Sequence, residues 1–455
     1  MAEPGPLAAL RGKRLGVVGL GISNVPLIQF LASHGFDLAG LDQKTAPQLK
    51  DRYQAVAPLL SEARLGEGYL ADLNFDVLFL GPGVKRTHPA LVEAARRGVR
   101  LSSEIELFFQ LCRGRICGVT GSAGKTTTTT LVGEMLRRVG LPVRVGGNIG
   151  VPLIAFALDV QPSDPVVLEL SSFQLQDLTV SPPVAVVTNI APNHLDYHAS
   201  MDEYVAAKER IFACQAAADW TVLNADDPAT RDMAGRCPGR VLWFSLAAPV
   251  DGAWLEGDAL VYQGQPLCRR GEVFIPGLHN VANLLAASLA AGRFGVPVEA
   301  MAEVARSFQG VPHRIELVRE LDGVVYLNDS KATAPNETMA ALAAVQTGLV
   351  LILGGSDKKS DFRELAEAVC GRARVVILVG AMAGKLADTL AETKARLGGG
   401  PELVTVDDYP AVVAAARRLA RPGEAVLLSP GCPSFDMFAN FEDRGDTFKR
   451  LVQGL

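Results

Sequence analysis

The stretch GVTGSAGKTTTTTLVGEM, from Gly118 to Met135, decides how the middle of this chain folds. It follows Arg115–Thr120, a short apolar run typical of a buried strand, and apolar residues recur behind it at helical spacing. A strand, a glycine loop and a helix in this order predict a phosphate site, because backbone N–H groups at a helix start attract an anion and Lys125 adds a positive charge. Two residues separate the first glycine from the Gly-Lys pair instead of the usual four, so a threonine-rich helix start without ligand remains the alternative.

Bulk composition limits the classes of protein to consider. At 455 residues, with 49% hydrophobic and 20% charged residues, the chain is expected to fold into about three globular domains. The net charge of −5 gives no case for nucleic acid or acidic membranes, and we find no membrane-spanning run and no signal peptide. The seven cysteines form no C-x-x-C pair, which favours a reducing compartment. We expect a cytoplasmic monomer without nucleic-acid partner or membrane insertion.

Short apolar runs alternate with helical patterns along the whole chain, which predicts an α/β fold with mainly parallel sheets. The expected strands form three series: Arg14–Val18, Asp37–Leu41 and Val77–Leu80; Ile116–Thr120, Val166–Leu170 and Ala185–Asn189; Val324–Leu327, Leu349–Leu353, Val375–Val379, Leu403–Val406 and Ala425–Leu428. Residues 237–275 are expected to add short strands and turns to the second sheet. Boundaries near Leu101–Glu106 and in Ser307–His313 predict domains over 1–105, 106–310 and 311–455.

Two glycine-containing loops follow strands of the first series. GVVGLGISN (Gly16–Asn24) precedes Asp42, about 20 residues on, as in a dinucleotide fingerprint, but Asn24 stands at the third glycine. GPGVKRTHP (Gly81–Pro89) ends another strand at the same carboxyl edge, where ligands bind in open sheets. We predict that these loops receive the pyrophosphate of a nucleotide; tight turns without ligand are the alternative.

Two candidate metal ligands follow strands of the second series. VVLELSSFQL (Val166–Leu175) places Glu169 at the end of a buried run, where a carboxylate is costly unless it is paired or holds a cation. Beside a phosphate loop it is expected to hold Mg²⁺ together with the hydroxyl of Thr126, although a structural ion pair is possible. His194, in TNIAPNHLDYH, is expected at the same edge of the sheet, although a lone histidine is more often a surface residue.

Several other stretches say little in isolation. Lys208 in AAKER has the position of a solvated helix lysine, and Asp329–Lys331 in LNDSKAT is typical of a turn after a strand. The stretches Gly354–Phe362 and Ser429–Phe448 each follow an expected strand and are typical of ordinary loops. Only their order along the chain makes them informative.

Taken together and in this order, these stretches resemble the Mur ligase family, ATP-dependent amide-forming enzymes of peptidoglycan precursor synthesis. The family's phosphate loop has the shortened spacing of TGSAGKTT. Within the family the chain most resembles the branch that adds D-glutamate to UDP-N-acetylmuramoyl-L-alanine, on the stretches GPGV…HP, SSEIEL, NDSKAT and LLSPGCPSFDMFANFEDRGDTF. The resemblance covers nearly the whole chain. It implies a Rossmann-like domain for the UDP-substrate, a central P-loop ATPase domain and a Rossmann-like domain for the incoming amino acid.

The resemblance also implies a role for particular residues, with ATP and two Mg²⁺ ions as cofactors. The implied ATP-binding residues are Gly121, Ser122, Ala123, Gly124, Lys125, Thr126, Thr127, Asn148, Asn280, Asn283, Arg314 and Asp329. The implied Mg²⁺ ligands are Thr126, Glu169, His194 and, as a carbamate, Lys208. The implied D-glutamate pocket comprises Thr333, Lys358, Ser434 and Phe441. The implied UDP-substrate residues are Ile22, Ser23, Asn24, Asp42, Gln43 and Gly83. Lys125, His194, Lys208 and Lys331 are the implied catalytic residues.

The implied reaction transfers the γ-phosphate of ATP to a substrate carboxylate, and the amine of D-glutamate then displaces phosphate from the acyl phosphate. Two positions depart from the family pattern: Ala123 stands where Asn is common, and Gly81 where Ser is usual. The DNPR stretch of the diaminopimelate-adding relatives is absent.

Three alternatives remain at this point. A neighbouring ligase that adds another amino acid is the nearest of them. An NAD-dependent oxidoreductase would explain Gly16–Asn24 but leaves the second phosphate loop without a role. A nucleotide-binding regulator without catalysis would keep Lys125 but would not need Glu169, His194 and Lys208.

Overall fold

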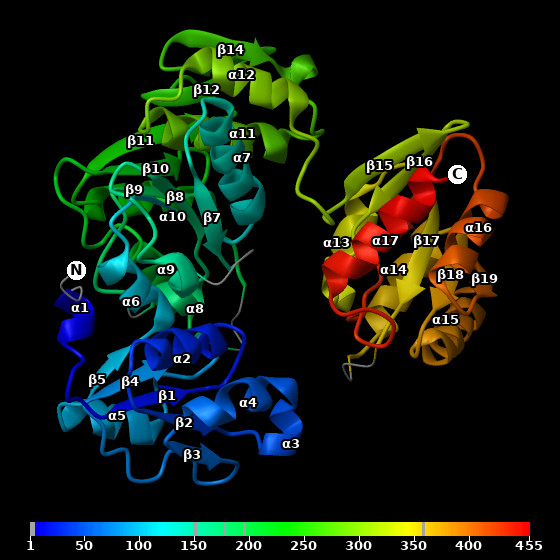
Figure 1. The fold of residues 1–455 in the computed structure, drawn as a ribbon. Helices are drawn as coiled ribbons and strands as arrows, with labels where there is room; N and C mark the ends of the chain where they lie inside the picture. The colour runs from blue at the N-terminus through cyan, green and yellow to red at the C-terminus, as the bar shows by residue number, and fades with distance from the viewer. Residues whose placement is uncertain (1–4, 149–152, 177, 194–196, 357–359) are drawn as a thin grey trace. The chain divides into compact units, whose positions relative to one another are not determined.

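The computed structural model describes residues 5–148, 153–176, 178–193, 197–356 and 360–455. The chain divides into two compact units, Met1–Phe308 and Gln309–Leu455 (Figure 1). In their described parts, the first unit contains two sheets and the second unit one, all mainly parallel. The predicted α/β fold with three mainly parallel sheets is therefore confirmed.

The first sheet has the parallel strand order β3-β2-β1-β4-β5. The strand order reverses beside β1, which is flanked by β2 and β4, so the loops after β1 and β4 lie next to each other. Its strands are β1 (Leu15–Val18), β2 (Leu38–Asp42), β3 (Glu62–Leu65), β4 (Val77–Leu80) and β5 (Arg100–Ser102). Its helices are α1 (Gly5–Ala8), α2 (Asn24–Ser33), α3 (Ala46–Leu49), α4 (Asp51–Val56), η1 (Ala57–Leu59) and α5 (Pro89–Arg96).

The second sheet has the order β14-β13-β12-β11-β10-β9-β6-β8-β7 and is parallel from β7 to β12. The antiparallel pairs β12–β13 and β13–β14 are the short strands expected within residues 237–275. Its strands are β6 (Arg115–Thr120), β7 (Arg144–Gly147), β8 (Pro165–Glu169), β9 (Val184–Val187), β10 (Trp220–Asn224), β11 (Arg240–Ser245), β12 (Gly252–Glu256), β13 (Ala259–Tyr262) and β14 (Gln265–Arg269). The helices around it are α6 (Glu104–Leu111), α7 (Lys125–Arg138), η2 (Leu153–Phe156), α8 (Ser172–Leu175), α9 (Met201–Glu209), α10 (Pro228–Met233), η3 (Ala234–Arg236), η4 (Arg270–Glu272), α11 (Leu278–Gly292) and α12 (Val298–Ser307).

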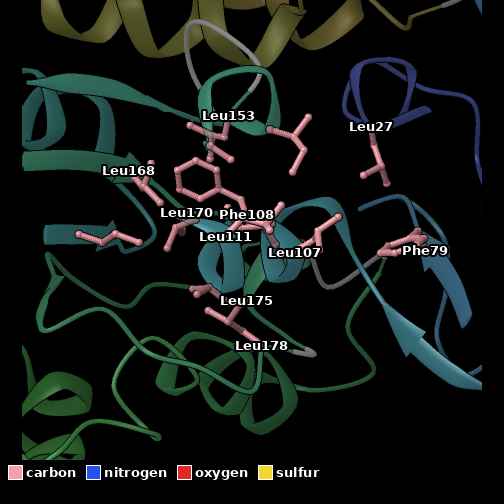
Figure 2. Close-up of a cluster of buried hydrophobic side chains, with 14 of the residues drawn as sticks. Leu27, Phe79, Leu107, Phe108, Leu111, Leu153, Leu168, Leu170, Leu175 and Leu178 are labelled. Atoms are coloured by element: carbon pink, nitrogen blue, oxygen red, sulfur yellow. The ribbon is translucent and has the colours of Figure 1, made fainter. Parts of the chain in front are cut away.

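Helix α6 joins the two sheets of the first unit through one hydrophobic core. The side chains of Leu107, Phe108 and Leu111 are buried in a cluster that includes Phe79 of β4 and Leu168 of β8 (Figure 2). Burying each such side chain contributes about 1.5–3 kcal/mol. The two sheets of the first unit are thus packed on one continuous core.

The second unit has the order β15-β16-β20-β17-β18-β19, with β15 antiparallel to β16 and the other pairs parallel. Apolar side chains pack on both faces of this sheet, against α13–α15 on one face and α16 and α17 on the other. Its strands are β15 (Glu316–Leu321), β16 (Val324–Asn328), β17 (Gly348–Gly354), β18 (Val375–Val379), β19 (Glu402–Thr405) and β20 (Glu424–Leu428). Its helices are α13 (Pro335–Ala344), α14 (Arg363–Arg372), α15 (Ala383–Leu397), α16 (Tyr409–Leu419) and α17 (Phe441–Gln453).

None of the helices in the described part of the chain is both long enough and apolar enough to cross a membrane.

Candidate active site

The phosphate loop follows β6, which lies between β8 and β9 where the strand order reverses, and it leads into α7. Gly121 has φ 146° and Gly124 has φ 80°, conformations that favour glycine. A Cβ on Gly121 would overlap Thr188 Oγ1, and a Cβ on Gly124 would overlap Asn283 Oδ1. Both the backbone conformation and the available space therefore require glycine at these two positions.

The rest of the loop is held by residues after β9. The N–H of Ala123 donates to Asn189 Oδ1 at 2.9 Å, and Ser122 Oγ donates to the carbonyl of Ala191 at 2.9 Å. Lys125 Nζ turns back over the loop and donates to the carbonyls of Gly121 at 3.0 Å and Ser122 at 3.1 Å. The predicted positive charge thus lies on the loop at the N-terminus of α7. Thr127 forms part of the first turn of the same helix.

Glu169 ends β8 and brings together two other predicted residues. Its carboxylate is 2% exposed; Oε2 accepts from Thr126 Oγ1 at 2.7 Å and Oε1 accepts from Asn148 Nδ2 at 2.8 Å. Both of these partners are neutral, so they do not balance the negative charge. A buried carboxylate beside a hydroxyl is a donor set that suits a hard cation such as Mg²⁺.

Lys208 of α9 also contacts the phosphate loop. Its side chain is buried, and Nζ donates to the carbonyl of Gly121 at 2.7 Å and to Thr120 Oγ1 at 3.3 Å. Burial lowers the pKa of this amine to about 7; the charge of Lys125 adds to the effect and that of Glu169 opposes it. A substantial fraction of Lys208 is therefore neutral near pH 7, unlike an exposed helix lysine.

His194 lies outside the described residues. Within the described ranges, no three His, Cys, Asp or Glu side chains are grouped to hold a metal. The expected ligand set is of a different kind, because it mixes a hydroxyl, a carboxylate, a histidine and a modified lysine.

The two asparagines predicted near the adenine lie at the start of α11, which packs against α7. Asn283 is buried; its Oδ1 accepts from Thr128 Oγ1 at 3.4 Å and its Nδ2 donates to Asn280 Oδ1 at 3.5 Å. Asn280 Nδ2 donates to the carbonyl of Pro276 at 2.7 Å. The structure therefore places Asn283 beside Gly124 of the phosphate loop, and Asn280 next to Asn283.

In the first sheet, two of the predicted UDP-substrate residues hold their own loops. Asn24 Nδ2 donates to the carbonyls of Val18 at 3.1 Å and Gly19 at 2.9 Å. Asp42 Oδ2 accepts from the N–H of Leu20 at 2.6 Å, and its Oδ1 accepts from the N–H of Lys44 at 2.7 Å. The buried Oδ1 of Asn24 accepts no hydrogen bond within the described part of the chain.

The other predicted residues of this loop region are accessible. Ile22 is 73% exposed, and Gln43 and Gly83 are also exposed. A small pocket opens at the loops after β1 and β4. The polar residues in its lining are Ser23, Asn24, Arg86, Ser103, Glu104 and Gln174.

In the second unit, predicted residues lie on loops after the adjacent strands β16 and β20. Asp329 is buried; its Oδ2 accepts from Ser429 Oγ at 2.7 Å and its Oδ1 from the N–H of Ile315 at 3.2 Å. Burial raises the pKa of Asp329 to about 7, and the nearby charge of Arg314 opposes this. The N–H of Lys331 donates to the carbonyl of His313 at 3.0 Å.

Three of the predicted D-glutamate residues lie on the loops after β16 and β20 or at the start of α17. Thr333 is half-buried and its N–H donates to Glu337 Oε2 at 2.8 Å, whereas Ser434 is buried in the loop after β20. The carbonyl of Phe441 accepts from Ser330 Oγ at 2.8 Å. Lys358 lies outside the described residues.

Arg444 was not singled out from the sequence, yet it connects these loops. It is 1% exposed; its Nε donates to Ser330 Oγ at 2.9 Å, its Nη2 to the carbonyl of Ser330 at 2.8 Å and its Nη1 to the carbonyl of Cys432 at 3.0 Å. The guanidinium therefore joins the loop that carries Lys331 to the loop that carries Ser434. An arginine near the start of a charged helix is typical of an exposed face, so sequence alone gives no signal for this role.

Comparison with known proteins agrees with this arrangement. Three families match successive parts of the chain: the MurD-like N-terminal domain of Mur ligases over residues 13–103, the Mur ligase middle domain over 119–291 and the Mur ligase glutamate ligase domain over 313–432. The UDP-N-acetylmuramoylalanine–D-glutamate ligase of Symbiobacterium thermophilum is 47% identical over 453 residues, covering 97% of this chain and 98% of the relative. The chain belongs to the Mur ligase family.

Other members of the Mur ligase family extend the comparison. The ligase of the same name from Clostridium kluyveri is 42% identical over 448 residues, covering 98% of each chain. The structure of UDP-N-acetylmuramate–alanine ligase from Thermotoga maritima matches with a TM-score of 0.55 at 20% identity, covering 97% of this chain and 99% of that one. MurF from Acinetobacter baumannii matches with a TM-score of 0.57 at 15% identity, covering 96% and 93%. These two structures support the Mur ligase fold alone.

Proposed function

We propose that this Mur ligase joins D-glutamate to UDP-N-acetylmuramoylalanine at the expense of ATP, in peptidoglycan precursor synthesis. The observation that carries the proposal is identity of 47% and 42%, over nearly the full length, with ligases named for this reaction. The enzyme is an amide-bond-forming acid–D-amino-acid ligase. We assign the UDP-substrate to residues 1–105, ATP to 106–310 and the incoming amino acid to 311–455, in a cytoplasmic monomer.

The nucleotide is assigned to the phosphate loop. The Mur ligase family uses ATP and Mg²⁺. The N–H groups at the start of α7, with Lys125 and Asn148, hold the β- and γ-phosphates, while Asn280 and Asn283 lie near the adenine. Thr126 and Glu169, which are already hydrogen-bonded to each other, would hold Mg²⁺ together with His194. When bound, Mg²⁺ neutralises charge on the transferring phosphoryl group.

In this reaction the chain's own residues mainly position the reacting groups. The substrate carboxylate attacks the γ-phosphorus, ADP leaves, and the resulting acyl phosphate is attacked by the amine of D-glutamate, which releases phosphate and a proton. Phosphoryl transfer depends on alignment and charge neutralisation. Lys125 supplies charge on the nucleotide side, and Lys331 on the side of the incoming amino acid. Thr333, Lys358, Ser434 and Phe441 form the D-glutamate pocket, and Arg314 and Asp329 approach the nucleotide.

Lys208 is proposed to act as a carbamate. A neutral amine adds CO₂ and loses one proton, which gives an anion whose oxygens suit Mg²⁺. The lowered pKa of Lys208 supports this step, since it makes the neutral amine available near pH 7. The same lysine as a cation would be repelled by bound Mg²⁺.

Phosphate release from ATP tests the proposed function. The chain is incubated with UDP-N-acetylmuramoyl-L-alanine and, in turn, D-glutamate, L-glutamate, D-alanine and the other amino acids that ligases of this family might add. We expect kcat/KM for D-glutamate to exceed that for each competitor by at least about 100-fold, because a site that pairs both carboxylates leaves groups unpaired with other substrates. A different preferred amino acid would instead favour a neighbouring ligase.

A further inference from the structure

Tyr197 connects the second sheet to the loop after β4. Its hydroxyl donates to the carbonyl of Val84 at 3.0 Å and accepts from Gln176 Nε2 at 3.0 Å. The ammonium of Lys85 lies 5.9 Å from the centre of the Tyr197 ring, within the range of a cation–π interaction. A side chain from the segment after β9 thus contacts the loop that carries Gly83, which we assign to the UDP-substrate.

Tyr197 belongs to an aromatic cluster with Phe173, His198 and Tyr204. The ring centres lie 4.6 Å apart for Phe173–Tyr197, 5.1 Å for Tyr197–His198 and 5.4 Å for His198–Tyr204. These distances are typical of packed aromatic pairs. His198 is buried, and its Nε2 lies 3.0 Å from Ser172 Oγ in the turn after β8.

The far end of the aromatic cluster lies against the nucleotide site. The hydroxyl of Tyr204 is 3.0 Å from Ser122 Oγ in the phosphate loop, and the ring centre of Tyr204 is 4.8 Å from Lys208 Nζ. Tyr204 is 1% exposed. The aromatic cluster therefore runs as packed side chains from the loop after β4 to the phosphate loop, and a displacement at one end is resisted at the other because interiors are close-packed.

We propose that Tyr197 is a positioning residue that couples the UDP-substrate site to the ATP site, so that each substrate raises the affinity for the other. The inference rests on the proposed function, since it takes the loop after β4 as part of the UDP-substrate site. Coupling of this kind is reciprocal: both substrates favour the same arrangement of the aromatic cluster. Its physical basis is the hydroxyl contact with Val84 at one end and the contact with Ser122 at the other.

The variant Tyr197→Phe removes the hydroxyl while leaving no partner group unpaired. The carbonyl of Val84 still accepts from Arg86 Nη1 at 2.7 Å, and Gln176 Nε2 still donates to the carbonyl of Phe173 at 3.2 Å. The fold is therefore expected to stay intact, which circular dichroism checks. Tyr53→Phe is the matched control, because Tyr53 packs against the core of the same unit and is not a member of the aromatic cluster.

The measurement is the Kd of a non-hydrolysable ATP analogue with Mg²⁺, by calorimetry, with and without saturating UDP-N-acetylmuramoyl-L-alanine. The Kd without the UDP-substrate, divided by the Kd with it, should exceed one in the unsubstituted chain and in Tyr53→Phe. In Tyr197→Phe this ratio should fall toward one, by up to about fivefold. The Kd of the analogue alone should change less than about twofold. An unchanged ratio in Tyr197→Phe, or no coupling in the unsubstituted chain, would overturn the inference. Failure of the unsubstituted chain to bind the UDP-substrate at all would contradict the proposed function itself.

A double variant tests whether the aromatic cluster acts as one connection. Tyr204→Phe removes the contact with Ser122, whose hydroxyl still donates to the carbonyl of Ala191. If both tyrosines act through the same cluster, Tyr197→Phe combined with Tyr204→Phe should lose no more coupling than the larger single loss. Losses that multiply would indicate two separate routes and would overturn the role of the aromatic cluster.

Discussion

The glycine loops after β1 and after β6 resemble each other in sequence and differ in what surrounds them. After β1, the polar side chains of Asn24 and Asp42 satisfy backbone groups of neighbouring turns. After β6, the loop lies beside three ionisable side chains, Lys125 of α7, Glu169 of β8 and Lys208 of α9. We infer that the first loop shapes a binding surface, whereas the second gathers the charge that phosphoryl transfer requires.

A glycine fingerprint therefore predicts a phosphate site but does not indicate whether chemistry occurs there. The distinguishing feature is a buried acid at the end of a neighbouring strand together with a buried lysine. Beside the first loop, Asp42 at the end of β2 is also a buried acid, but its two oxygens each accept a backbone N–H, as a structural acid does.

The largest effect is expected at Lys125. Lys125→Ala removes the positive charge at the N-terminus of α7 and should lower kcat by about 100- to 1000-fold, the usual cost of a lost charge-stabilising group. The substitution leaves the loop glycines in place, so the circular dichroism spectrum should not change. Lys13→Ala, which removes an exposed lysine near Asp76, is the control and should keep full activity. Near-normal amide formation by Lys125→Ala would remove the distinction between the two loops.

Much of this comparison could be predicted from sequence, because buried parallel strands are continuous apolar runs bounded by loops. Strands β1, β4, β6, β8 and β9 were all expected within two residues of their observed ends. β15 was not expected: Glu316–Leu321 is a half-buried antiparallel edge strand with charged residues between apolar ones. The placement of Glu169 at a strand end was also predictable, since it follows directly from where the apolar run stops.

Other parts of the site depend on tertiary contacts that leave no pattern in the sequence. The spacing around Asn24 does not reveal that its amide folds back on the carbonyls of Val18 and Gly19. Nor does a helical position reveal that Arg444 is buried between two loops, because the partner carbonyls are distant along the chain.

A smaller effect, and a conditional one, is expected at Lys208. Lys208→Ala should lower kcat by about 100-fold, since it removes one proposed Mg²⁺ ligand. Added acetate should restore part of the activity by supplying a carboxylate in the vacated space, as a carbamate role requires. Full activity without acetate would exclude the carbamate. Arg236→Ala is the control for a disturbance of α9, because the charge of Arg236 pairs with Glu209, which lies on the same helix as Lys208.

The corresponding change in the first loop should affect binding alone. Asp42→Ala leaves the N–H groups of Leu20 and Lys44 without their acceptor, which should raise KM for the UDP-substrate by about tenfold. At saturation, kcat and KM for ATP should change less than about twofold. A large fall in kcat would mean that the loop after β1 takes part in chemistry, contrary to the comparison.

The smallest effect concerns the buried acid of the second unit. The pKa of Asp329 is raised to about 7 from an ordinary value of 3.8, so between these values the folded chain holds a proton that the unfolded chain has lost. The contribution of Asp329 to stability is therefore present at low pH and lost as the pH rises toward 7. The free energy of unfolding of the unsubstituted chain, minus that of Asp329→Asn, should therefore decrease from pH 5 to 7. Above pH 8 this difference should not decrease further. Urea unfolding followed by circular dichroism measures this difference; a difference that does not depend on pH would show that Asp329 is not protonated in the fold.

Oxygen transfer tests the central claim, that the chain activates a carboxylate with ATP at the loop after β6. UDP-N-acetylmuramoyl-L-alanine labelled with ¹⁸O in its carboxylate is converted in the presence of ATP and D-glutamate, and the released phosphate is analysed by mass spectrometry. The account predicts one ¹⁸O atom in each phosphate released from fully labelled substrate, because the carboxylate oxygen leaves with the phosphoryl group. Amide formation that releases unlabelled phosphate would contradict it.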